Sequence, residues 1–227
     1  MFYRTNDLIH SRRVLWHLEE SIPNILEVYG NKFNVDFART LALVHDDAEI
    51  IGGDVQLHDK EHMTPEESRA LARKERAIIP EMVKRYNPVA NGFSYKRLLT
   101  TAKNKGNLEA QFVSFFDKFD GGGEAWHEIW AGNSCFLLPG GGNNGHSGGY
   151  VRRLNDFPNK YPDMKRFFEH FPQYLPGSFD FRSVAESSKP HTTESLQKDS
   201  GYPPYERWKR TIMKYEGTNL LVTQLEF

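Results

Sequence analysis

The stretch 37–54, FARTLALVHDDAEIIGGD, decides the fold of this chain. Its apolar residues predict a buried helix over 37–51 that ends at two successive glycines, where the chain can turn. The adjacent residues His45 and Asp46 lie on this predicted helix. A His-Asp dipeptide occurs often by chance, so its meaning depends on what the rest of the chain supplies.

Most of the remaining first half of the chain is also predicted to be helical. Thr5 or Asn6 can cap one helix, which ends before Pro23, and Thr64 with Glu67 forms a capping box at the start of another. Helices are therefore expected over 8–20, 64–86, 94–101 and 108–130.

The last of these helices contains three successive glycines at 121–123. Each glycine in a helix interior costs roughly 1 kcal/mol against alanine. We expect the three glycines to mark a kink or the close approach of another backbone.

The composition changes after Asn133, where glycine and polar residues become frequent. We expect a glycine-rich loop, two helices and a strand or packed tail, over 139–149, 161–171, 205–215 and 219–227. The sequence thus predicts an all-α fold, with a helical bundle over 1–138. A mixed, loop-rich C-terminal extension over 139–227 is expected to pack on it.

Charge and composition restrict the class of protein. The formal net charge is -1 over 227 residues, which disfavours nucleic acid as a partner. No window approaches the roughly 20 apolar residues of a membrane span, so no membrane contact is expected. The single cysteine, Cys135, excludes an intrachain disulfide and fits a reducing compartment. We therefore expect a cytoplasmic protein.

Residues on other predicted helices complete a candidate metal site around the dipeptide. His10 and Asp117 join His45 and Asp46, with Asp120 as the competitor of Asp117. Imidazole and carboxylate ligands together suit one divalent ion of manganese, cobalt, iron, zinc or magnesium that keeps open positions. These positions can take water and a phosphate oxygen, so that the ion activates the water and neutralises phosphate charge. The set predicts a divalent metal site that is open to water and phosphate.

Two acidic residues after the dipeptide are candidate catalytic groups. Glu49 lies three positions after Asp46, nearly one helical turn on, and so faces a similar direction. Asp54 follows the glycine pair, where a tight turn is allowed. Both are expected within reach of a water molecule on the metal.

The run His45–Asp54, HDDAEIIGGD, resembles the signature of the bacterial HD-domain 5′-deoxynucleotidases and their relatives, which reads roughly H-D-x-x-E-x-x-x-G-D. Three other segments are also similar to the family: Arg4–Ser11, Glu109–Asp117 and Ala131–Asn133. The distance between Asp117 and Ala131–Asn133 favours Asp117 over Asp120 as the final aspartate.

The resemblance implies an all-helical HD domain with one catalytic divalent metal. It also implies a homodimer that removes phosphate from nucleoside 5′-monophosphates, preferably the deoxy forms. By position it gives Glu49 an acid/base role and Asp54 the positioning of water or substrate. The metal ligands that it assigns are His10, His45, Asp46 and Asp117.

The chain departs from the family ahead of the first histidine, where the family carries a sugar-selecting Arg-Trp pair on a helix. Arg4 and the loop residue Lys60 are expected to contact the nucleotide substrate. Arg152 and Arg153, in the C-terminal extension, are expected to meet phosphate and to replace part of the missing helix. The alternative is that the extension only caps exposed helices or forms a dimer contact.

Other functions remain open at this point. A deoxynucleoside triphosphate triphosphohydrolase keeps the fold and changes the bond that is cleaved. A dinuclear HD phosphodiesterase would use His58 or His62 for a second metal. A non-catalytic nucleotide-binding module is a third alternative, although such a module has no need of the complete set of histidines, aspartates and Glu49.

Overall fold

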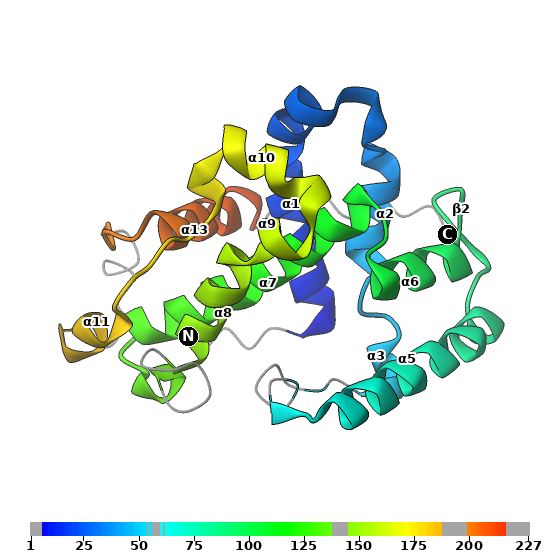
Figure 1. The fold of residues 1–227 in the computed structure, drawn as a ribbon, viewed down its shortest axis with the longest axis horizontal. Coiled ribbons are helices and arrows are strands. Elements are labelled where there is room, and N and C mark those ends of the chain that lie inside the picture. Colours follow the sequence, from blue (N-terminus) through cyan, green and yellow to red (C-terminus); the bar gives the residue numbers. More distant parts are fainter. Residues whose placement is uncertain are drawn as a thin grey trace. The chain divides into compact units, whose positions relative to one another are not determined.

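Figure 1 shows the fold of the chain in a computed structural model. The structure describes residues 6–53, 55, 60, 62–137, 145–187 and 199–216. Within these ranges the regular secondary structure is helical apart from one antiparallel hairpin, formed by the short strands β1 (Val89–Ala90) and β2 (Phe93–Ser94). The expected all-α fold is thus confirmed. Among the described residues, no helix combines the length and apolarity needed to cross a membrane.

The chain separates into two compact units. One consists of Met1–Phe116 with Tyr215–Phe227, and the other of Asp117–Lys214. The division falls within the long helix α7 (Leu108–Trp130). It comes earlier in the chain than the change of composition, and the domain boundary expected at residue 138 stays a prediction.

The first unit is built from helices whose starts carry the expected caps. The Asn6 side chain accepts a hydrogen bond from the Ile9 backbone, and Thr64 and Glu67 form both bonds of a capping box. After α1, the described elements of this unit up to α7 are η1 (Gly30–Lys32), α2 (Val35–Val44), α3 (Glu49–Gly52), α5 (Pro65–Arg85) and α6 (Tyr95–Asn104).

Helix α1 (Asp7–Tyr29) continues through Pro23, so the predicted break there is wrong. A proline inside a helix removes one backbone hydrogen bond and costs about 3 kcal/mol. Ile22, Ile25 and Val28 are buried on the same part of the helix. Burying each such side chain contributes about 1.5–3 kcal/mol, so packing outweighs the local cost of the proline.

The predicted continuous helix over 37–51 is also wrong, because α2 ends at Val44 and α3 begins at Glu49. The backbone between them forms tight turns with bonds from Asp47 N to Val44 O (3.2 Å) and from Glu49 N to Asp46 O (2.7 Å). A partner distant in sequence holds this turn, since the Tyr95 hydroxyl donates to Asp47 Oδ2 at 2.6 Å. The His-Asp dipeptide therefore lies in a turn at the end of a helix.

The first half of α7 is anchored inside the first unit. The Asn34 backbone amide, at the start of α2, donates to the buried Glu109 Oε1 at 2.7 Å. The rings of Tyr29 and Phe33 both pack edge-on against Phe112, with centroids 5.9 and 5.6 Å away. These contacts fix α7 relative to α1 and α2 up to the residue before Asp117.

The second unit contains shorter helices after α7. The expected helix over 161–171 is split, because Pro162 opens a separate 3-10 turn. Helix α8 begins at Gly145, within the expected loop 139–149, and the expected tail over 219–227 lies outside the described residues. Its described elements after α7 are η2 (Ser134–Leu137), α8 (Gly145–Asn155), α9 (Phe157–Lys160), η4 (Pro162–Met164), α10 (Lys165–His170), η5 (Pro172–Tyr174), α11 (Phe181–Ser187) and α13 (Pro203–Tyr215).

The three glycines of α7 admit aromatic side chains rather than another backbone. A Cβ atom at Gly123 would lie 2.0 Å from Cδ1 of Trp208, and one at Gly121 would lie 2.7 Å from the Tyr150 hydroxyl oxygen. The nearest atoms at the three positions belong to the side chains of Tyr150, Trp126 and Trp208, so the expected close approach of another backbone is not what the glycines serve. The helix accepts the cost of glycine because the rings pack directly against its backbone.

Candidate metal centre

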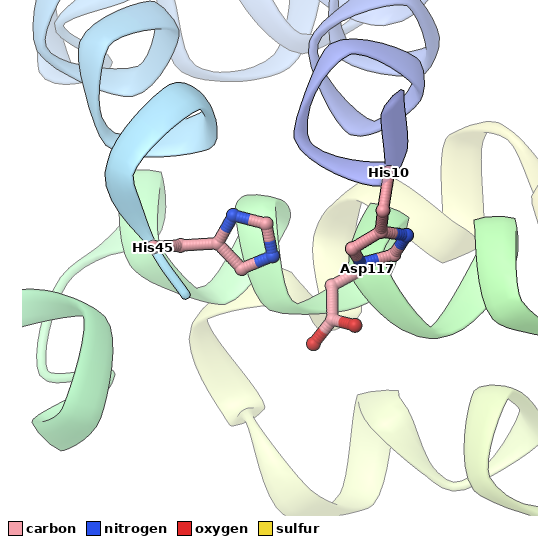
Figure 2. Close-up of side chains that lie close together, drawn as sticks. All are labelled: His10, His45 and Asp117. Carbon is pink, nitrogen blue, oxygen red and sulfur yellow. The ribbon is translucent and has the colours of Figure 1, made fainter. Parts of the chain in front are cut away.

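Three of the four predicted ligands form a group that could hold a metal ion. One ligand atom from each of His10, His45 and Asp117 lies within 4.8 Å of the others. Figure 2 shows the three side chains, which come from α1, the end of α2 and α7.

The geometry of His45 orients one ring nitrogen toward the group. His45 is 6% exposed, and its Nδ1 lies 2.9 Å from the Ala42 carbonyl oxygen. A carbonyl oxygen only accepts, so Nδ1 carries a proton and Nε2 is the atom left to bind a metal. Hydrogen bonding of one imidazole nitrogen to a carbonyl is a usual way to orient a metal-binding histidine.

Asp46 joins the same histidines, although it is not one of the three residues of the group. Its Oδ2 lies 3.1 Å from His45 Nε2 and 3.7 Å from His10 Nε2. A carboxylate oxygen that close to an imidazole nitrogen requires a proton on that nitrogen or a cation shared by the two atoms. Asp46 Oδ2 therefore lies beside the histidine nitrogens that would bind a metal.

The spacing of the donor atoms fits a divalent metal. Histidine nitrogen and carboxylate oxygen bind zinc at about 2.0–2.2 Å, so opposite ligands lie about 4.2 Å apart and neighbouring ligands about 3 Å apart. The upper separation in the group, 4.8 Å, requires only a small inward movement. The His45 and Asp46 atoms already have the spacing of neighbouring ligands.

Asp117 and Asp120, the two candidates for the last ligand, have different surroundings. Asp117 belongs to the group, and its Oδ2 is 2.6 Å from Lys118 Nζ. Asp120 is completely buried and accepts a hydrogen bond from Trp208 Nε1 at 2.8 Å. The arrangement therefore favours Asp117, as the spacing to Ala131-Gly132-Asn133 had suggested.

Asp47 supports the turn that carries the dipeptide. Burial raises the pKa of its carboxyl group, and the hydrogen bond from Tyr95 opposes that rise. The pKa of Tyr95 is raised in turn, by burial and by the same carboxylate. The pair is a partly buried hydrogen bond between α6 and the turn that carries His45 and Asp46.

Glu49, the predicted acid/base residue, lies at the start of α3 with its side chain 15% exposed. Its Oε1 is 3.9 Å from Nζ of Lys103 on α6, which also lies 3.6 Å from Oε2 of Glu75 on α5. The break between α2 and α3 means that Glu49 does not follow Asp46 on one continuous helix. The ion pair with Lys103 links the Glu49 side chain to α6.

The predicted substrate-binding residues are placed only in part by the described structure. Arg4 lies outside the described residues, as does the catalytic candidate Asp54. Lys60 is half-buried, while Arg152 is exposed and Arg153 half-buried on α8 of the second unit. The substrate roles of these residues stay predictions.

The other histidines are accounted for in part. His17 is buried on α1, as packing predicts, and His127 shares a hydrogen bond of 2.8 Å with the Tyr205 hydroxyl. His62 is exposed, and His58 lies outside the described residues.

Sequence reasoning missed Lys103, Glu75, Tyr95 and Lys118. Only Lys118 left a local signal, because it directly follows the aspartate ligand candidate. Tyr95 lies 48 residues from Asp47, and Lys103 is as remote in sequence from Glu49, where no spacing rule connects them.

Comparisons of this chain with models of protein families, with curated proteins and with solved structures found no match.

Proposed function

We propose that this chain is a divalent-metal-dependent phosphohydrolase of the HD type that acts on nucleoside 5′-monophosphates. The observation that carries the proposal is the grouping of nitrogen and oxygen atoms from α1, from α7 and from the turn after α2. Asp46 Oδ2 faces Nε2 of both His10 and His45, and the same two histidines group with Asp117. Two histidines and two carboxylates suit a metal that keeps positions open for substrate.

In this proposal His10, His45, Asp46 and Asp117 hold the metal. When bound, the ion supplies a Lewis acid that neutralises phosphate charge and makes water more acidic. Glu49 takes the proton that the attacking water loses as its oxygen bonds to phosphorus. The bond from phosphorus to the 5′ oxygen breaks, Glu49 gives the proton that it has taken to that oxygen, and the products are nucleoside and phosphate.

A triphosphohydrolase is the second candidate, and one feature of the second unit favours it. The pKa of Lys160 is lowered by burial and then by the positive charges of Arg153 and Lys118. Three cations thus lie near one another, and Lys118 also pairs with Asp117. A longer phosphate chain is the kind of ligand that such a cluster attracts.

The test is a screen of divalent metals against nucleotides with the products identified. Free phosphate from monophosphates supports the leading proposal, whereas tripolyphosphate from triphosphates supports the second. Cleavage of phosphodiesters supports the dinuclear alternative, and nucleotide binding without any product supports a non-catalytic module. Asp46→Ala should lose both bound metal and turnover, while Asp163→Ala, which changes an exposed aspartate of the second unit, should keep both. Full metal content and activity in the Asp46 variant would disprove the site.

A further inference from the structure

Lys103 lies close to Glu49, the predicted acid/base residue. Its Nζ lies between two carboxylates, 3.9 Å from Glu49 Oε1 and 3.6 Å from Glu75 Oε2. The exposed fractions of the Lys103, Glu49 and Glu75 side chains are 16%, 15% and 26%. All three residues belong to the first unit, and they join α3, α5 and α6.

Helix α3, which carries Glu49, depends on neighbouring elements for its position. Helix α3 has four residues, and Ala48 gives its start no side-chain cap. A helix this short is not stable by itself, so its place depends on neighbouring elements. Contacts from α5 hold its end: Lys74 Nζ donates to the Gly52 carbonyl at 3.3 Å, and a Cβ atom at Gly52 would lie 2.7 Å from Ile78 Cδ1.

Those α5 contacts fix the backbone of α3 but not the side chain of Glu49. Two partly buried carboxylates repel each other, and Lys103 supplies the positive charge that allows both to stay. Without this charge, Glu49 is expected to turn toward water or to move away from Glu75. A displacement of about 1 Å in a reacting group can lower a rate about 10²-fold.

We propose that Lys103 is a positioning residue that acts through Glu49, directing its carboxylate for the acid/base role proposed for it. The distance of 3.9 Å is that of an ion pair without a direct hydrogen bond, so Lys103 directs the carboxylate without binding it tightly. This inference rests on the proposed phosphohydrolase function.

The test compares Lys103→Met with Lys103→Arg, and uses Lys96→Met as the matched control. Lys96 is an exposed lysine on the same helix. We expect the Lys103→Met variant to lose about 10- to 100-fold in kcat, while KM and the amount of bound metal change less than about twofold. The arginine variant keeps the charge and should recover most of the rate, and the control should equal the wild type.

A double-variant comparison separates positioning from a structural role. If Lys103 acts through Glu49, then adding Lys103→Met to Glu49→Gln should lower the rate no further. A further loss of the same size as in the wild-type background would overturn the proposal. Glu75→Gln provides a second measurement should Lys103→Met not fold. Lys103 keeps its partner Glu49 in that variant, so a loss in kcat as large as that expected for Lys103→Met would also overturn it.

The outcome for Lys103 can be distinguished from the outcome for the proposed function. If the wild-type protein releases no product from any nucleotide, the function itself fails, whatever the variants do. If the wild type is active and Lys103→Met matches it in kcat, the function stands and the role of Lys103 is refuted.

Discussion

Asp117 and Asp120 lie three residues apart on α7, and we predict that replacing each with alanine gives opposite results. Asp117→Ala should remove the bound metal and leave the fold nearly as stable as before. Asp120→Ala should keep the metal and destabilise the protein. The contrast follows from their partners, which are the two histidines and Lys118 for Asp117 and Trp208 for Asp120.

The magnitude for Asp120 comes from its burial. Asp120 is 0% exposed and Trp208 is 3% exposed, and their hydrogen bond measures 2.8 Å. Removing the acceptor leaves a buried indole N–H without that partner, which costs about 1–3 kcal/mol. Asp117 is 18% exposed, and its pair with Lys118 contributes less than about 1 kcal/mol, as for other ion pairs in contact with water.

The assay combines urea unfolding, followed by circular dichroism, with elemental analysis of the dialysed protein. Asp120→Asn is the matched control, because the amide oxygen can still accept from Trp208 and should recover most of the stability. The reasoning is refuted if Asp120→Ala loses metal while Asp117→Ala retains it, since the assignment of the last ligand would then be reversed.

Three further predictions concern the packing around the site. Gly123→Ala should destabilise the protein by up to about 2 kcal/mol, as measured by urea unfolding. The clash of the new methyl group with Trp208 costs about 1–3 kcal/mol, and the better helix propensity of alanine returns about 1 kcal/mol. Tyr95→Phe should weaken metal binding, measured by titration. It should also lower the stability by about 1 kcal/mol, because the partly buried Asp47 carboxylate loses its donor. Burial raises the pKa of Tyr150 to about 12, so this tyrosine ionises first in the unfolded chain as the pH rises. Stability should therefore fall between about pH 10 and pH 12. Tyr150→Phe should reduce that decline in alkaline unfolding curves.

Each of these predictions has its own control. Gly106→Ala has nothing within 4 Å of the added atom and should be nearly neutral, so an equal loss at both glycines would contradict the clash. Tyr86 is 48% exposed, and Tyr86→Phe should leave metal affinity unchanged. If Tyr150→Phe follows the same stability curve as the wild type at alkaline pH, the burial of that phenol is not the cause of the decline.

The sequence alone was sufficient for features that depend on neighbouring residues. The capping box of Thr64 and Glu67 and the cap at Asn6 are formed as expected, because a side chain at the start of a helix bonds to a backbone group three residues on. The presence of the long helix α7 was predicted for the same kind of reason, and the helical fold class followed from the apolar periodicity. The candidate ligands His10 and His45 were identified from residue type and motif.

Only the tertiary structure decided how these parts are used. The turn at His45 and Asp46 replaces a predicted helix because Tyr95, 48 residues from Asp47, bonds to it. Asp120 is withdrawn from the candidate site by Trp208, 88 residues away. Local hydrogen bonds link residues three or four positions apart and so leave a pattern in the sequence. Contacts across 48 and 88 residues require loop closure and the packing of the elements between the two partners. Such contacts leave no short pattern in the sequence.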